Sequence, residues 1–248
     1  MKVQLIEYTG AGYADPARMA ANILVFTKQT RLEMRQDLFD EVCNWPWEKV
    51  EAELEYMANT IPSSWEFINY TFLITDVTRA FTHQFVRTRT GSYAQQTMRV
   101  LNVEGWTYGT GPSLSGSTED VYNECMEKIA DTYEELIDRG AKIEDARGVL
   151  PTNIHTNIVA KFDLRTLADT ARKRASSRTQ GEYREVMEAM KAEVLRVQPW
   201  ASMFFGRTFD GAAISLENQL SCLEQRGQIS QDHRITMLKL LDQMRATA

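Results

Sequence analysis

Four arginines lie close together in one stretch of this acidic chain, and that stretch contains no acidic residue. A guanidinium group donates two parallel charge-assisted hydrogen bonds to a phosphate, which fixes the orientation of the ligand as well as adding energy. A single arginine is more often paired with an acid elsewhere in a fold, but a whole cluster without acids indicates a site for an anion. The stretch covers residues 77–103 and contains Arg79, Arg87, Arg89 and Arg99.

A second basic cluster follows later in the chain, in a stretch that we expect to be helical. Asp163 and Asp169 are the only acids nearby. Helical spacing places Asp169 on the same face as Arg165 and Arg172. Part of this cluster also suits a solvated helix end, where the helix dipole favours positive charge. Together the two clusters indicate a ligand with several anionic groups, and the second consists of Arg165, Arg172, Lys173, Arg174 and Arg178.

Common nucleotide-binding and metal-binding motifs are missing from the sequence. No GxxxxGK motif with a following Ser or Thr, and no GxGxxG motif, comes after an expected strand, so side chains and irregular loops would have to hold a nucleotide. The three histidines and three cysteines are isolated, without a CxxC or HxxxH pair, and we therefore expect no metal. We expect each cysteine to be a small buried apolar residue: Cys43, Cys125 and Cys222.

Length and charge restrict the class of protein. The chain has 248 residues, of which 28 are basic and 34 acidic, which gives a net charge of −6. That charge disfavours general binding to nucleic acid or to anionic membranes. The sequence contains no run of about 18 apolar residues and begins without the features of a signal peptide. We therefore expect one domain over residues 1–248, in the cytoplasm, without a membrane or an obligatory nucleic-acid partner.

Hydrophobic periodicity and capping residues predict both strands and helices. Alternating, β-branched or aromatic stretches predict strands over 2–8, 65–77 and 153–162, with a short extended piece near 98–103. Asp15 followed by Pro16 is typical of a helix start. Helices are predicted over 16–29, 33–44, 48–59, 78–87, 121–139, 143–149 and 182–197, from Asp163 onward, and through most of the chain after Leu216.

The run THQFVRTRTGSYAQQTMR over residues 82–99 resembles the signature of the flavin-dependent thymidylate synthases. That signature is an Arg-His-Arg triplet, seven further residues, a Ser, and an Arg two positions later. Residues 63–66 resemble the family's His-x-Ser/Thr-x-x-Glu-His segment, and residues 147–151 resemble its Arg-x-x-Leu-Pro. Residues 163–167 are similar to its Asn-Ala-Arg-Ser-Leu, and Arg174 falls at its downstream Leu-Arg position. These five segments occur in the family's order and span about half the chain.

The sequence departs from the family pattern at several positions. Thr88 replaces the central histidine of the triplet, and Thr97 replaces the serine while keeping a hydroxyl. Two flanking histidines and two asparagines of the pattern are also replaced, and Arg178 stands where a histidine is common. The substituted residues are Ile61, Phe67, Asp163 and Asp169.

The resemblance implies an α+β fold with a central sheet packed by helices, in a homotetramer that holds FAD and dUMP where subunits meet. Methylenetetrahydrofolate is the implied carbon donor and NADPH the implied reductant. The implied dUMP contacts are Gln84, Arg87, Gln95, Gln96, Thr97, Arg99, Arg147 and Arg174. The implied FAD contacts are Ser63, Glu66, Arg87, Thr88, Arg89, Asp163, Arg165 and Asp169.

The expected activity is the FAD-dependent methylation of dUMP to dTMP. Arg174 would polarise the uracil ring, while Gln95 and Thr97 would orient it. Reduced flavin delivers hydride in this family, so no protein nucleophile is needed. Two alternatives remain at this point: a paralogue that hydroxymethylates a pyrimidine nucleotide, and a catalytically silent homologue that binds a nucleotide or RNA.

Overall fold

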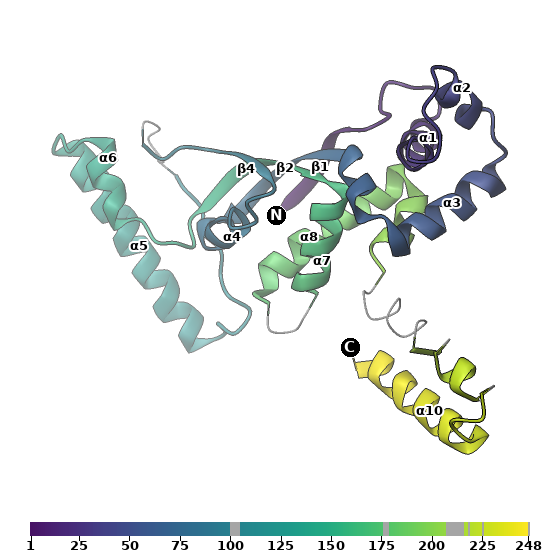
Figure 1. Ribbon diagram of the computed structural model, residues 1–248. Helices are drawn as coiled ribbons and strands as arrows, with labels where there is room; N and C mark the ends of the chain where they lie inside the picture. Colours follow the sequence, from purple (N-terminus) through teal and green to yellow (C-terminus); the bar gives the residue numbers. More distant parts are fainter. Residues whose placement is uncertain (100–104, 176–178, 207–215, 218, 225, 248) are drawn as a thin grey trace.

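A four-stranded antiparallel sheet forms the centre of the protein (Figure 1). The computed structural model describes residues 1–99, 105–175, 179–206, 216–217, 219–224 and 226–247. The sheet has the order β1-β2-β4-β3, with helices packed against it, which confirms the expected α+β class. Its strands are β1 (Lys2–Tyr8), β2 (Asn69–Thr78), β3 (Ser92–Gln95) and β4 (His155–Asp163).

Helices gather at both ends of the sheet and along one side of it (Figure 1). The first group is α1 (Pro16–Gln29), α2 (Leu38–Cys43), α3 (Trp47–Thr60) and the 3-10 turn η1 (Pro62–Phe67). At the opposite end lie α5 (Ser117–Asp138), α6 (Ile143–Ala146) and η2 (Arg147–Val149). The remaining helical segments are α4 (Arg79–Phe85), α7 (Leu164–Arg174), α8 (Gly181–Val197), η3 (Pro199–Phe204) and α10 (Gln231–Thr247). None of the described helices is long and apolar enough to cross a membrane.

The core forms where alternate residues of β2 and β4 meet α7 and α8. A strand has a side-chain period of two, so every second residue faces the same side. On β2 this places Tyr70, Phe72 and Ile74 in the interior. Burial of each such side chain contributes about 1.5–3 kcal/mol. Opposite them, α8 buries Tyr183, Val186, Met187, Met190 and Val194.

Three predicted elements differ from those in the structure. The strand expected over 65–77 begins only at Asn69, because Pro62 opens the 3-10 turn in which Trp65 Nε1 donates to Met57 O at 3.0 Å. The helix expected over 33–44 forms only over Leu38–Cys43. The extended piece expected near 98–103 lies earlier, at Ser92–Gln95, where backbone pairing with β4 is available. Residues 100–103 of that prediction lie outside the described part of the chain.

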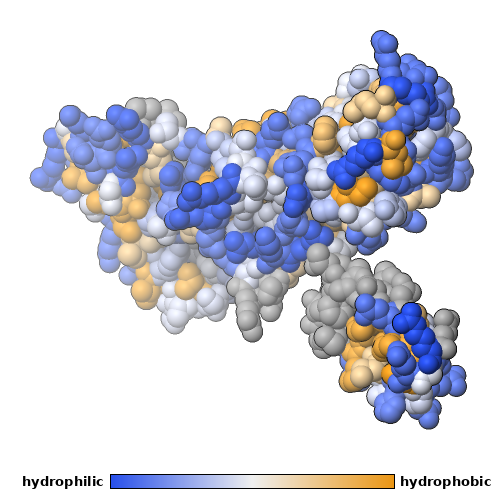
Figure 2. All heavy atoms as spheres, in the orientation of Figure 1, coloured by the Kyte–Doolittle hydropathy of each residue, from blue (hydrophilic) through white to orange (hydrophobic). Residues whose placement is uncertain are grey.

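The prediction that the cysteines are buried is wrong. Cys125 and Cys222 are exposed, and Cys43 is half-buried. Among its described residues, α5 buries only Met126 and Tyr133, so the neighbouring position 125 faces outward. Figure 2 shows that apolar residues also reach the visible surface near α5 and over the C-terminal helices. Val121 of α5, for example, is 68% exposed.

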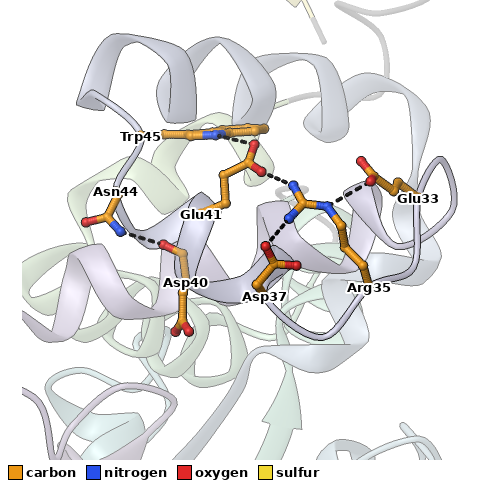
Figure 3. Close-up of polar contacts among 7 residues, drawn as sticks. All are labelled: Glu33, Arg35, Asp37, Asp40, Glu41, Asn44 and Trp45. Carbon is orange, nitrogen blue, oxygen red and sulfur yellow. Dashed lines mark hydrogen bonds and ion pairs between the residues drawn. The ribbon is translucent and has the colours of Figure 1, made fainter.

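Arg35 organises the connection between α1 and α2 (Figure 3). Its guanidinium pairs with Glu33 at 2.7 Å, with Asp37 at 2.6 Å and with Glu41. Glu41 also accepts a 3.4 Å hydrogen bond from Trp45 Nε1. The hydrogen bonds from Arg35 lower the pKa of both the Asp37 and Glu41 carboxyls. Within residues 33–37, where the helix is absent, Glu33 and Asp37 are thus both tied to the side chain of Arg35.

We expect the Arg35→Gln substitution to weaken the dependence of melting temperature on acid pH. The native carboxyls have pKa values below the ordinary 3.8 and 4.5, so their contribution is present above those values and is lost as pH falls through the lowered ones. Thermal melts from about pH 6 to about pH 3 should therefore bring parent and variant together at the acid end. Arg139→Gln, which removes the same charge from the residue that follows α5, is the matched control. A constant gap between parent and Arg35→Gln across this range would contradict the expectation.

Candidate functional site

A cavity of about 510 Å³ opens between the start of α4 and the α6–η2 segment. Among the described lining residues, two arginines and a histidine contribute positive or ionisable groups, and Glu144 contributes the single carboxylate. Such a cavity is large enough for a small anionic ligand. Its lining residues are Arg79, His83, Met98, Glu144, Arg147, Gly148, Leu150, Pro151 and Thr152.

Arg79 is the most constrained cation in this cavity. Its Nη1 atom is buried and has no hydrogen-bond partner among the described residues. Burial lowers the pKa of its guanidinium, and the charge of Arg147 lowers it further. Because both effects disfavour the charged form, an anion between the two arginines would relieve them together. Arg79 belongs to the first arginine cluster, but the sequence analysis did not assign it to the substrate.

Two distant segments hold the start of α4 in place. Thr78 caps the helix, because its hydroxyl accepts from Phe81 N at 3.1 Å. The carboxylate of Glu182, at the start of α8, accepts from both Thr78 N at 2.7 Å and the Thr78 hydroxyl. The next backbone group, Arg79 N, donates to Ile154 O at 3.0 Å. Glu182 thus helps to position Arg79. The role of Glu182 could not be recognised from the sequence, because an acidic residue in the first turn of a helix is common.

Two predicted substrate residues meet at Glu144. Arg99 Nε lies 3.3 Å from the Glu144 carboxylate, and Arg147 Nε donates to Glu144 O at 3.1 Å. Arg99 is in turn tied to Thr97, whose hydroxyl accepts from Arg99 N at 3.1 Å. Arg147 and Glu144 therefore line the cavity, while Arg99 reaches it through Glu144 and Thr97 contacts the backbone of Arg99. Glu144 was not identified from the sequence.

A strained bulge in β2 holds the end of β3. Asp76 has φ 57, the only positive φ of a described non-glycine residue, where the pairing with β4 shifts register. Its backbone N donates to Asn157 Oδ1 at 3.1 Å, and Asn157 Nδ2 donates to Gln96 Oε1 at 2.9 Å. The neighbouring Gln95 directs its Nε2 at the hydroxyls of two threonines, at 3.0 and 3.4 Å. Both predicted glutamines are therefore held within the fold.

Three of the predicted flavin residues, Ser63, Glu66 and Arg165, form a second group, where η1 packs against α7. Arg165 pairs with Glu66 at 2.6 Å. Ser63 accepts a 2.8 Å hydrogen bond from Arg31, a residue that the sequence analysis missed because it lies about thirty positions away. We call Arg31, Ser63, Glu66 and Arg165 the η1–α7 cluster.

Both aspartates that replace family asparagines have local partners. Asp163 caps α7, since its Oδ1 accepts from Thr166 N at 2.7 Å. Asp169 forms an ion pair with Arg172. The added negative charges are thus balanced by a helix N-terminus and by an arginine.

The other predicted residues lie between or beyond these groups. Arg87 Nε donates to His83 O at 3.4 Å, and Gln84 Nε2 donates to Gln180 Oε1 at 2.7 Å. The carbonyl oxygen of Thr88 accepts a 2.8 Å hydrogen bond from the Tyr93 hydroxyl, and Arg89 is exposed. The guanidinium of Arg174 lies over the ring of Tyr183. Arg178 lies outside the described residues. No hydrogen bond or ion pair within the described ranges connects the η1–α7 cluster to the residues that line the cavity. The two groups of residues are therefore not linked by polar contacts within one described chain.

Comparisons with known proteins cover both groups of residues. Residues 4–200 match the protein family described as "Thymidylate synthase complementing protein". A flavin-dependent thymidylate synthase of Clostridium tetani is 33% identical over 220 residues, which covers 80% of this chain and 84% of that protein. One from Sulfolobus acidocaldarius is 30% identical over 201 residues, covering 80% and 74%. One from Pyrococcus furiosus is 36% identical over 139 residues, covering 53% and 56%.

We expect Asp163→Ala to lower the free energy of unfolding by about 1 kcal/mol, because it removes the cap of α7. Asp163→Asn should keep stability close to that of the parent, since asparagine caps equally well. Urea unfolding measures both. Asp15→Ala is the matched control, because it removes the equivalent 2.9 Å cap of α1 without touching the η1–α7 cluster. A loss for the asparagine variant as large as that for alanine would show that the charge, and not the cap, matters at this position.

Proposed function

The chain belongs to the flavin-dependent thymidylate synthase family, and on that premise we propose that it acts as one domain that converts dUMP to dTMP. FAD is the proposed cofactor. Methylenetetrahydrofolate supplies the carbon, and NADPH supplies the reducing equivalents.

The unpartnered, buried Nη1 atom of Arg79 is the observation that carries this proposal. Arg79 and Arg147 both line the cavity, and Glu144, the only acidic residue among the described lining residues, is already engaged by Arg99. A phosphate monoester carries about two negative charges at neutral pH and accepts several charge-assisted hydrogen bonds. The 5′-phosphate of dUMP therefore suits the space between Arg79 and Arg147, with Thr97 and Arg99 beside it.

The η1–α7 cluster has the chemistry that FAD requires. Arg31 and Arg165 are cationic, Ser63 adds a hydroxyl, and all three lie on the surface where η1 meets α7. Guanidinium groups of this kind suit a pyrophosphate. When bound, FAD supplies the hydride that completes the methyl group.

The protein's own residues then have two tasks. Arg79, Arg147 and Arg99 bind and orient the nucleotide, and Arg174 stabilises negative charge that develops on the uracil ring. Gln95 and Gln96 keep the end of β3 fixed beside the ring. A reaction whose hydride came from a bound flavin would need no thiolate, and the described residues that line the cavity include no cysteine.

We extend the proposal to a homotetramer in which neighbouring copies complete each site. The separation of the cavity from the η1–α7 cluster supports this, since dUMP and FAD must come into contact for the reaction. Exposed apolar side chains support it as well, because such side chains are typical of subunit contacts. They include Leu32 and Met34 at 77% exposure and Val121 at 68%.

The direct test is incubation with dUMP, methylenetetrahydrofolate, FAD and NADPH, followed by mass analysis of the nucleotide. We expect the mass of dTMP, and only when all four compounds are present. The mass of a hydroxymethylated nucleotide would instead assign the chain to a hydroxymethylase. A protein that binds dUMP, takes up no FAD and makes no product would be a silent nucleotide-binding homologue.

Arg79→Gln should weaken dUMP binding about 10-fold to 100-fold, because a hydrogen bond between charged groups contributes about 1.5–3 kcal/mol. Binding of deoxyuridine, which lacks the phosphate, should change little. Isothermal titration with both ligands measures the difference. Arg139→Gln is the control for loss of charge on a distant helix. Equal losses for dUMP and deoxyuridine would show that Arg79 does not contact the phosphate.

A further inference from the structure

The side chain of Arg174 is held by an aromatic ring. Arg174 is the last residue of α7, and its Cζ lies 4.5 Å from the ring centroid of Tyr183, in the first turn of α8. This distance is within the range of a cation–π contact. The guanidinium of Arg174 forms no hydrogen bond or ion pair with a described residue. One face of the group is therefore covered by the ring, while its N–H donors remain available to a ligand.

The ring of Tyr183 is itself fixed by its surroundings. It is completely buried and stands edge-on to Phe81, with centroids 5.2 Å apart, and to Phe85, with centroids 5.8 Å apart. Both phenylalanines belong to α4, whose start is held by Glu182, the residue that precedes Tyr183. The plane on which Arg174 lies thus has little freedom to move.

The hydroxyl of Tyr183 does not explain this arrangement. Its oxygen is buried and has no hydrogen-bond partner among the described residues. A buried, unpaired hydroxyl costs free energy. The favourable contact with Arg174 therefore comes from the face of the ring, which a phenylalanine would also provide.

We propose that Tyr183 is a positioning residue that holds the guanidinium of Arg174 in place for the uracil ring through a cation–π contact. The inference rests on the proposed function, in which Arg174 stabilises charge on the substrate. It adds a residue that lies outside both arginine clusters. A flexible arginine would have to be ordered during the reaction, whereas one already held against a rigid ring is preorganised.

The test compares Tyr183→Leu, which removes the ring, with Tyr183→Phe, which keeps it. We expect kcat to fall about tenfold in Tyr183→Leu, or ~1.4 kcal/mol, with the KM for dUMP changed by less than about threefold. Tyr183→Phe should keep at least about half of the parent kcat. The control is Phe72→Leu, which removes a buried ring of β2 from the same core. If kcat fell equally in Phe72→Leu at similar thermal stability, Tyr183 would have only a structural role.

A second arm separates positioning from packing. In an Arg174→Ala background, Tyr183→Leu should lower kcat by no more than about twofold, because the group that it positions is already absent. A full tenfold loss in that background would overturn the proposal.

A third arm does not depend on turnover. Phenylglyoxal modifies arginine side chains, and peptide mass spectrometry reports the rate at each site. We expect Arg174 to react several times faster in Tyr183→Leu than in the parent or in Tyr183→Phe, while exposed Arg139 reacts equally in all three. Equal rates at Arg174 would refute the contact. If the parent makes no dTMP, the proposed function fails, and this arm still decides whether Tyr183 holds Arg174.

Discussion

The hydrogen bonds from Thr78 to the carboxylate of Glu182 are the constraint on which the rest of the site depends. They join the end of β2 to the start of α8, two segments about one hundred residues apart in sequence. On one side of this joint, α4 begins and carries Arg79 into the cavity. On the other side, the next residue of α8 is Tyr183, on which Arg174 lies. The position of Glu182 therefore influences both Arg79, which lines the cavity, and Arg174, at the end of α7. A shift of α8 would move both arginines.

Charge compensation distinguishes the arginines that are paired with carboxylates from Arg79. Arg165 and Arg172 are paired with Glu66 and Asp169, and three carboxylates surround Arg35. Exposed pairs of this kind add little to stability but limit where a side chain can lie. The Nη1 atom of Arg79 differs, because it is buried without a partner. A buried, unpaired cationic donor is costly in an isolated chain, and a bound anion removes that cost.

Local signals in the sequence predicted the elements that depend on local chemistry. The cap at Asp15 with Pro16, the alternation of β4 and the start of α7 at Asp163 all appear in the structure. The anion site that the arginine clusters indicate stays a prediction. Contacts between distant segments could not be predicted: Glu182 binds Thr78, Arg31 binds Ser63, and the ring of Tyr183 is fixed by phenylalanines of α4. The position of β3 depended on pairing with β4, and the exposure of the cysteines depended on which face of a helix the core covers.

The departures from the family pattern make sense once their partners are known. At position 163 the requirement is a side-chain oxygen that caps α7, and aspartate meets it as well as asparagine does. At position 169 the extra negative charge is balanced by Arg172, one helical turn away. At position 88 the backbone is held through its carbonyl oxygen, which accepts from Tyr93, so this contact does not depend on the side chain. At positions 163 and 169 the substituted side chains thus have partners within α7, and at position 88 the contact with Tyr93 uses the backbone alone, so these three departures fit their local structure.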